Sequence, residues 1–181
     1  MKYLNHAAVV GVALVAAGCA SAPGGGASTS SAARSGAQHR QKLFGWWMER
    51  RSIDHGKVVR LTLRCPDGVY LSDVRTLGAD GKLRHESQTV GDWGVSGPVY
   101  FTIEHERYRG GKHEKVDLRK ERYYNAYRIL ALSYTSFRYR AYADGTVLNA
   151  HRASPDDIAE LGQQPGAMTL PSSCNGGDSD D

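Results

Sequence analysis

The strongest constraint on the fold is a set of segments in which apolar and polar residues alternate, separated by short turn signals. In one such segment, Val59, Leu61 and Leu63 alternate with polar residues. A period of two is expected of a strand with one buried face. Turn signals such as Asp80-Gly81 lie between the segments, several of them at hairpin spacing. The chain is therefore predicted to fold as sequential antiparallel hairpins.

Eight strands are predicted from this pattern, over residues 43–51, 57–65, 69–78, 82–91, 98–108, 115–125, 127–141 with a candidate break near Ser133, and 146–152. An even number of sequential hairpins closes most simply into a barrel, which leaves no strand edge exposed. After the last strand, Ser154-Pro155-Asp156-Asp157 has the capping hydroxyl, proline and acids that begin a helix. The predicted fold class is all-β: an eight-stranded antiparallel up-and-down barrel with one short C-terminal helix.

The N-terminus has the features of a secretory signal. Lys2 precedes an apolar run over residues 7–17, which is shorter than the roughly 20 residues that a membrane-spanning helix needs. The sequence Ala16-Ala17-Gly18-Cys19 resembles the lipobox of bacterial lipoproteins, in which cleavage precedes a cysteine that is then acylated. The resemblance implies a signal peptide over 1–18 and a lipid anchor at Cys19, the alternative being a buried helix with an incidental cysteine. By the sorting rule of those lipoproteins, Ala20 implies the outer membrane, with the domain facing the periplasm.

Composition divides the remaining chain into three parts. Residues 19–40 contain the lipidated cysteine and a stretch rich in Ala, Ser and Gly, a composition typical of a flexible linker. Residues 41–165 are the predicted barrel with its helix, and residues 166–181 form an acidic tail rich in Gly and Ser. The barrel is basic, but nucleic acid is not an expected partner outside the cytoplasm.

Two cysteines remain if Cys19 is acylated, namely Cys65 and Cys174. Disulfides persist in the oxidising environment that a secreted domain enters. A bridge between Cys65 and Cys174 is therefore predicted. The alternative is two unpaired thiols.

The ends of the predicted barrel carry a recognisable pattern. Gly45-Trp46-Trp47 opens the first strand and Arg152 closes the last, which resembles the lipocalin and wider calycin pattern, and Gly91-Asp92-Trp93 is a second Gly-x-Trp. The resemblance implies that Trp47 and Arg152 stack at the closed end of the barrel. The Thr-Asp-Tyr sequence of classical lipocalins is missing, and the alternative is another antiparallel barrel with large core tryptophans.

A second resemblance is to bacterial inhibitors of C-type lysozyme, which are also small lipidated barrels with one disulfide. Cys65-Pro66-Asp67-Gly68 and Ser96-Gly97-Pro98-Val99-Tyr100 match two stretches of their pattern. The later Trp-x-Lys-Gly element of that family is absent. This resemblance would imply a protein-binding role.

No motif in the chain indicates an enzyme. The Gly-x-Ser-x-Gly elbow of many hydrolases is absent. His105 and His113 lie among acidic residues, but their spacing matches no familiar zinc pattern. We therefore expect no catalytic residue, no metal and no cofactor.

Aromatic residues provide the functional hypothesis. The chain has 10 Tyr, 3 Trp and 3 Phe, and tyrosine suits an amphipathic ligand because it combines an apolar face with a hydroxyl. The candidates to line a ligand site are Phe101, Tyr127, Phe137 and Tyr139. We predict an envelope protein that binds a small amphipathic or hydrophobic ligand; the alternative is a protein-binding lipoprotein, either an adaptor or a lysozyme-type hydrolase inhibitor. Small barrels can also be filled entirely by their own side chains.

Overall fold

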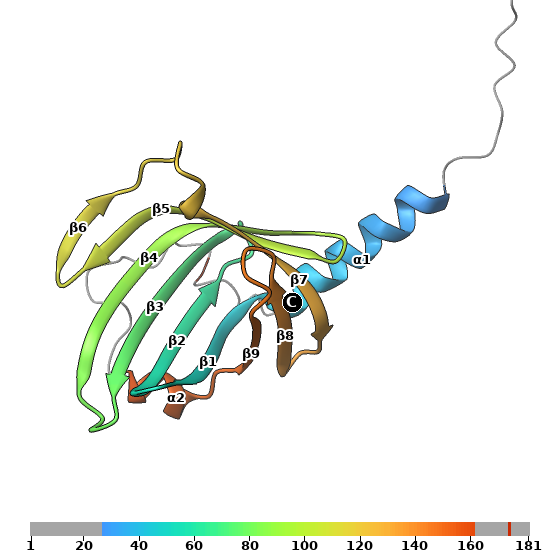
Figure 1. The fold of residues 1–181 in the computed structure, drawn as a ribbon. Helices are drawn as coiled ribbons and strands as arrows, with labels where there is room; N and C mark the ends of the chain where they lie inside the picture. Colours follow the sequence, from blue (N-terminus) through green and yellow to red (C-terminus); the bar gives the residue numbers. More distant parts are fainter. Residues whose placement is uncertain (1–26, 162–173, 175–181) are drawn as a thin grey trace, which may run out of the picture.

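The computed structural model describes residues 27–161 and Cys174, and its core is a closed barrel (Figure 1). Every pair of neighbouring strands is antiparallel. Pairing of β4 with β5, and of β1 with β9, closes eight strands into a ring, and β6 extends β5 beyond it. The predicted fold class is confirmed. The strands are β1 (Gly45–Ile53), β2 (Gly56–Arg64), β3 (Val69–Gly78), β4 (Leu83–Ser96), β5 (Val99–Arg109), β6 (Lys112–Lys115), β7 (Tyr124–Leu132), β8 (Ser136–Ala141) and β9 (Val147–Arg152).

One of the eight predicted strands is wrong. Residues 115–125 do not form a barrel strand, because the chain leaves β6 and turns at Asp117, whose carboxylate accepts hydrogen bonds from the Arg119 backbone and guanidinium. The 3₁₀ turn η1 (Glu121–Tyr123) follows. The eighth strand comes instead from residues 127–141, which divide into β7 and β8 at a turn where the Ser133 hydroxyl accepts the N–H of Ser136 at 2.9 Å.

The apolar face of β2 lies outside the barrel. Val59 and Leu61 are buried there against Met48 and Leu161, and Leu63 packs with Cys65, Leu71 and Cys174. The polar residues that alternate with them on β2 face the interior. Both faces of β2 are thus covered, so the apolar side of its alternation does not identify the barrel interior.

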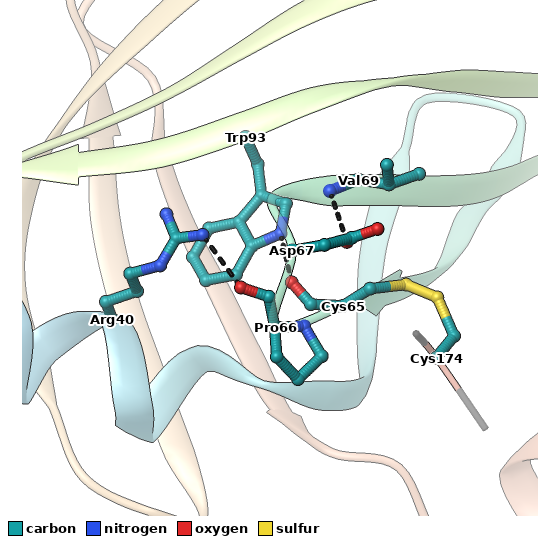
Figure 2. Close-up of a disulfide and its surroundings, with 7 residues drawn as sticks. All are labelled: Arg40, Cys65, Pro66, Asp67, Val69, Trp93 and Cys174. Carbon is teal, nitrogen blue, oxygen red and sulfur yellow. Dashed lines mark hydrogen bonds between the residues drawn. A yellow bond between two sulfur atoms is a disulfide. The ribbon is translucent and has the colours of Figure 1, made fainter. Parts of the chain in front are cut away.

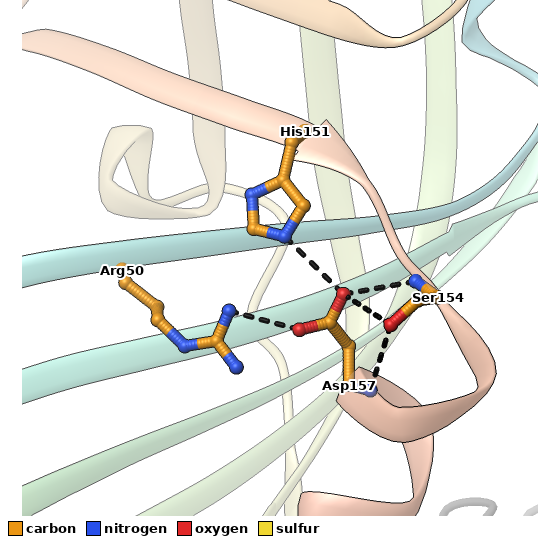
Figure 3. A network of polar contacts seen from close by, with 4 residues as sticks. All are labelled: Arg50, His151, Ser154 and Asp157. Atoms are coloured by element: carbon orange, nitrogen blue, oxygen red, sulfur yellow. Dashed lines mark hydrogen bonds and ion pairs between the residues drawn. The ribbon is translucent and has the colours of Figure 1, made fainter.

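The helix α2 (Pro155–Glu160) lies where the sequence predicts a short helix and is joined to two strands by one carboxylate (Figure 3). Asp157 accepts hydrogen bonds from the backbone and hydroxyl of Ser154, which form a capping box, and from His151 of β9. It also pairs with Arg50 of β1 at 2.9 Å. The serine and the histidine both contact the same carboxylate oxygen, so this cluster is a helix cap and not a nucleophile–base pair.

A helix occupies much of the predicted linker. Helix α1 (Ala27–Leu43) leads into β1 (Figure 1), which corrects the expectation of a flexible chain through residue 40. Tertiary contacts override the composition: Leu43 is fully buried in the aromatic core, and His39 Nδ1 lies 3.2 Å from the carbonyl oxygen of Gly97. Within the described residues, no helix combines the length and apolar character required to cross a bilayer.

Candidate functional site

The end of the barrel next to α1 is closed by Trp47 and Arg152. The two residues are direct partners across β1 and β9, and the guanidinium carbon lies 4.3 Å from the indole ring. Arg152 donates to the carbonyl oxygens of Lys42 at 2.8 Å and Phe44, and the Trp47 indole N–H donates to Leu43 at 2.9 Å. The contact expected from the lipocalin-like pattern is present, and it also holds the C-terminal end of α1.

Aromatic side chains form a floor above this closure. Phe137 stacks on Tyr139 at 4.3 Å and meets Trp47 edge-on at 6.0 Å. Tyr100 packs against Phe137 and stacks on Tyr127. Phe137, expected to line a ligand site, is instead buried in this floor and is absent from the cavity wall.

A chamber of about 140 Å³ lies inside the barrel, next to this floor. Tyr127 and Tyr139 line it, in agreement with the sequence analysis. Phe101 does not, because Tyr100, Thr102 and Glu104 of the same strand face inward, whereas the Phe101 ring lies against Gly94. The chamber wall consists of Arg60, Thr62, Arg64, Tyr70, Ser72, Val74, Thr89, Tyr100, Thr102, Glu104, Asn125, Tyr127 and Tyr139.

A second cavity of about 390 Å³ adjoins the chamber on the side of the turn between β8 and β9. Arg60, Asn125 and Tyr127 line both cavities. Glu49 and Arg51 contribute to the wall of the second cavity. We call the second cavity the mouth, and the three shared residues mark its boundary with the chamber.

The polar groups that line the chamber and the mouth differ in how many hydrogen-bond and ion-pair partners they have. Glu49 accepts a 2.6 Å hydrogen bond from the Tyr139 hydroxyl and lies opposite Arg60 in the strand register, and Glu104 forms an ion pair with Arg107. Arg64 differs. Its Nε and Nη2 donate to the Tyr100 hydroxyl at 3.1 and 3.0 Å, but its buried Nη1 has no hydrogen-bond partner within the part of the chain that the structure describes.

Three tyrosines of the chamber, Tyr70, Tyr127 and Tyr139, have raised pKa values. Burial raises the pKa of Tyr127 to about 12. Burial, and then the nearby Glu49, raise the pKa of Tyr139 well above its ordinary value, and burial also raises that of Tyr70. These hydroxyls therefore remain protonated. Tyr139 already donates to Glu49, whereas Tyr70 and Tyr127 would favour a ligand that accepts hydrogen bonds.

Cys65 and Cys174 lie at disulfide distance from each other (Figure 2). Cys65 directly follows Arg64 at the end of β2, and its Cα lies 4.9 Å from that of Cys174. The Trp93 indole N–H donates to the Cys65 carbonyl at 3.1 Å, and Arg40 of α1 donates to the Pro66 carbonyl at 3.0 Å. The two residues that follow Arg64 are thus held in place by the cysteine pair and by these two hydrogen bonds.

The sequence analysis missed the two inward arginines and most of the hydroxyls. Arg60, Thr62 and Arg64 are the polar half of the alternation that predicts β2. In a strand with one buried face, the polar half is expected to face solvent and the apolar half to face the interior. One feature of the sequence could have drawn attention to Arg64. It directly precedes Cys65, which is predicted to form a disulfide and therefore to be buried or crosslinked.

Three other residues singled out in the sequence do not belong to this site: Cys19, His105 and His113. Cys19 lies outside the described residues. His105 contacts Asp92 at 3.1 Å and His113 lies 3.8 Å from Glu106, each as a separate pair. Among residues 27–161 and Cys174, no three His, Cys, Asp or Glu side chains lie close enough together to hold a metal ion.

The chain matches no protein-family model. No curated protein is significantly similar to it in sequence.

Proposed function

We propose that this protein is a lipid-anchored binding protein of the bacterial cell envelope that holds a small amphipathic molecule inside a lipocalin-like barrel. The observation that carries the proposal is the division of the interior into an aromatic floor and a polar chamber with an adjoining mouth. The floor offers apolar contact and the chamber offers oriented polar groups, and small-molecule sites combine these two features.

The closure between Trp47 and Arg152 supports the lipocalin-like assignment. Gly45 adds to it, because its φ of +86° favours glycine and a Cβ there would lie 3.0 Å from Nη1 of Arg152. The Gly-x-Trp pattern therefore has a physical reason in this chain: the glycine leaves room for the arginine, and the tryptophan receives it.

The anchor rests on the resemblance of the N-terminus to a lipobox. Helix α1 enters the barrel at the end that Trp47 and Arg152 close. An acylated Cys19 would therefore attach the domain through its closed end. The mouth would then face away from the bilayer, toward the periplasm.

A protein-binding role is the second candidate, favoured by the hairpin of β5 and β6. The hairpin extends beyond the barrel (Figure 1), and β6 is the outer strand of that extension. Lys112, His113 and Glu114 are exposed on it. A charged, exposed hairpin of this kind is suited to contact a partner protein.

Native mass spectrometry of the protein extracted from its own membrane tests these alternatives. The proposal predicts a co-purified molecule of low mass that is lost in Asn125→Trp, which places a large side chain at the boundary between chamber and mouth. Arg138→Gln, on the exposed face of β8, should retain it. A bound protein together with an empty barrel would favour the second candidate instead.

A further inference from the structure

Arg64 is an unusual residue for a barrel interior. Its side chain is 3% exposed, and it lines the chamber. Burying a charge is costly unless an opposite charge or a full set of hydrogen bonds accompanies it. Such a residue therefore requires an explanation from its surroundings.

The surroundings stabilise the cation only in part. Its guanidinium carbon lies 4.8 Å from the Tyr100 ring and 5.7 Å from the Phe137 ring, so two aromatic faces contribute. The Tyr100 hydroxyl accepts from Nε and Nη2. The two N–H groups of Nη1 have no acceptor among the described residues.

The carboxylates of the interior are engaged by other groups. Glu104 pairs with Arg107. Glu49 accepts from Tyr139 and lies opposite Arg60 in the register of β1 and β2. No ion pair between described residues includes Arg64, so the chamber contains a cation that lacks an acidic partner.

Donors also predominate on the nearby wall. Burial keeps the Tyr70 and Tyr127 hydroxyls protonated. The Thr62 and Ser72 hydroxyls lie 3.3 Å apart and hydrogen bond to each other, so one of the two keeps a proton for a ligand, and Thr102 adds another hydroxyl to the wall. An acceptor that carries negative charge would satisfy both Nη1 and these hydroxyls. A purely hydrocarbon ligand would satisfy neither.

We infer that the chamber binds a small organic carboxylate, with the carboxylate accepting hydrogen bonds from Nη1 of Arg64 and the rest of the molecule extending toward Arg60 and the mouth. This inference rests on the proposed binding function and specifies the ligand class. Arg64 would be the charge-recognising residue. The chamber volume of about 140 Å³ limits the buried part to a short molecule or the head of a longer one.

Titration of the folded domain with matched probes tests the inference. Hexanoate and hexanamide have the same chain and differ in charge, and hexylamine carries the opposite charge. Binding followed by NMR chemical shifts of the chamber residues should favour hexanoate over hexanamide by about tenfold or more, with no response at the chamber to hexylamine.

Variants of Arg64 distinguish an effect on carboxylate recognition from an effect on folding. Arg64→Met should abolish the preference for hexanoate while the melting temperature stays at or above that of the unchanged protein, because replacing a buried unpaired charge by an apolar side chain of similar volume need not destabilise. Arg64→Lys should restore part of the preference. Arg138→Gln removes one exposed charge and should leave the preference intact.

Three results would overturn the inference: equal binding of hexanoate and hexanamide, a preference that survives in Arg64→Met, or no response to hexanoate at the chamber. If Arg64→Met does not fold, Arg64→Lys and the unchanged protein still provide the comparison. A neutral molecule found in the barrel by native mass spectrometry would leave the proposed binding function in place and reject only the carboxylate.

Discussion

The hydroxyl of Tyr139 donates a 2.6 Å hydrogen bond to Oε2 of Glu49, joining β8 to β1 across the intervening strand β9. Both residues are buried, at 3% and 6% exposure. Glu49 is an acid inside a barrel, and this hydroxyl is a donor that keeps it satisfied. The pair therefore couples the aromatic floor to the polar part of the interior.

Tyr139→Phe should destabilise the fold by about 1 to 3 kcal/mol, because the ring is retained but a buried carboxylate oxygen loses its donor. Denaturant unfolding measures this loss. Tyr134→Phe is the matched control, since Tyr134 is exposed and its hydroxyl should contribute little. Equal stability of the two variants would mean that Glu49 finds another donor.

Truncating Trp47 and truncating Arg152 at the closed end of the barrel should lower the stability of the fold by different amounts. Trp47→Ala empties a large volume in the floor and should cost about 3 to 5 kcal/mol, leaving the protein poorly folded. Arg152→Ala removes the stacking and the hydrogen bonds to Lys42 and Phe44, and it should lower the melting temperature while the β-sheet circular dichroism is retained at low temperature. Unchanged melting of both variants would contradict a closing role for the pair.

The period of two in the sequence was sufficient to predict a barrel but not which face of each strand is inside. On β5, Val99, Phe101 and Ile103 form the apolar half of the alternation, and yet Tyr100 and Thr102 face the chamber. Hydrophobic alternation indicates the face that excludes water. In a strand whose outer face is covered by other parts of the chain, as that of β2 is by α2 and Cys174, the apolar face need not be the interior.

Helix α1 and the strand wrongly predicted over residues 115–125 show a second limit of prediction from sequence. Leu43 and His39 make α1 part of the domain through contacts with distant residues, and composition carries no information about such contacts. The turn at Asp117 depends on hydrogen bonds between the Asp117 carboxylate and Arg119. These residues lie in a charge-rich segment whose sequence pattern resembles that of a solvent-exposed strand. Trp47 and Arg152 could be paired from the sequence because Gly45-Trp46-Trp47 and Arg152 resemble the lipocalin pattern, and the structure places the two residues opposite each other on β1 and β9.

Removal of the link between Cys65 and Cys174 should destabilise the protein by about 2 to 4 kcal/mol, since it closes a separation of 109 residues. Cys174→Ser should match the reduced parent protein in urea unfolding. The variant itself should not respond to reductant. Reductant sensitivity that persists in Cys174→Ser would contradict the pairing, as would two alkylatable thiols in the oxidised mature domain under denaturing, non-reducing conditions.

The proposed lipid anchor predicts a second cysteine phenotype. Cys19→Ser should abolish acylation and release the protein from the membrane, because no other residue of the lipobox-like sequence carries a thiol. Metabolic labelling with a fatty-acid analogue, followed by membrane fractionation, measures both effects. Cys174→Ser serves as the control and should remain labelled. Labelling that persists in Cys19→Ser would refute the lipobox assignment.

The cap of α2 predicts how stability changes in acid. Hydrogen bonds from the Ser154 backbone, the Arg50 and Ser154 side chains and His151 hold the pKa of Asp157 well below its usual range. The unfolded chain therefore takes up a proton at Asp157 near its ordinary pKa of about 3.9, at a pH where the folded protein still does not. This contribution to stability is fully present above about pH 5 and is lost as the pH falls through and below the unfolded value.

Asp157→Asn removes the titrating group while keeping a side chain of the same shape. The difference in unfolding free energy between the parent protein and Asp157→Asn should be largest near neutral pH and should shrink steadily between about pH 5 and pH 2. Asp156→Asn, which changes the neighbouring exposed acid of the same first turn, should show a much smaller dependence on pH. Urea unfolding across this range measures both differences, and a gap for Asp157→Asn that stays constant with pH would show that its carboxylate is not what joins α2 to β1 and β9.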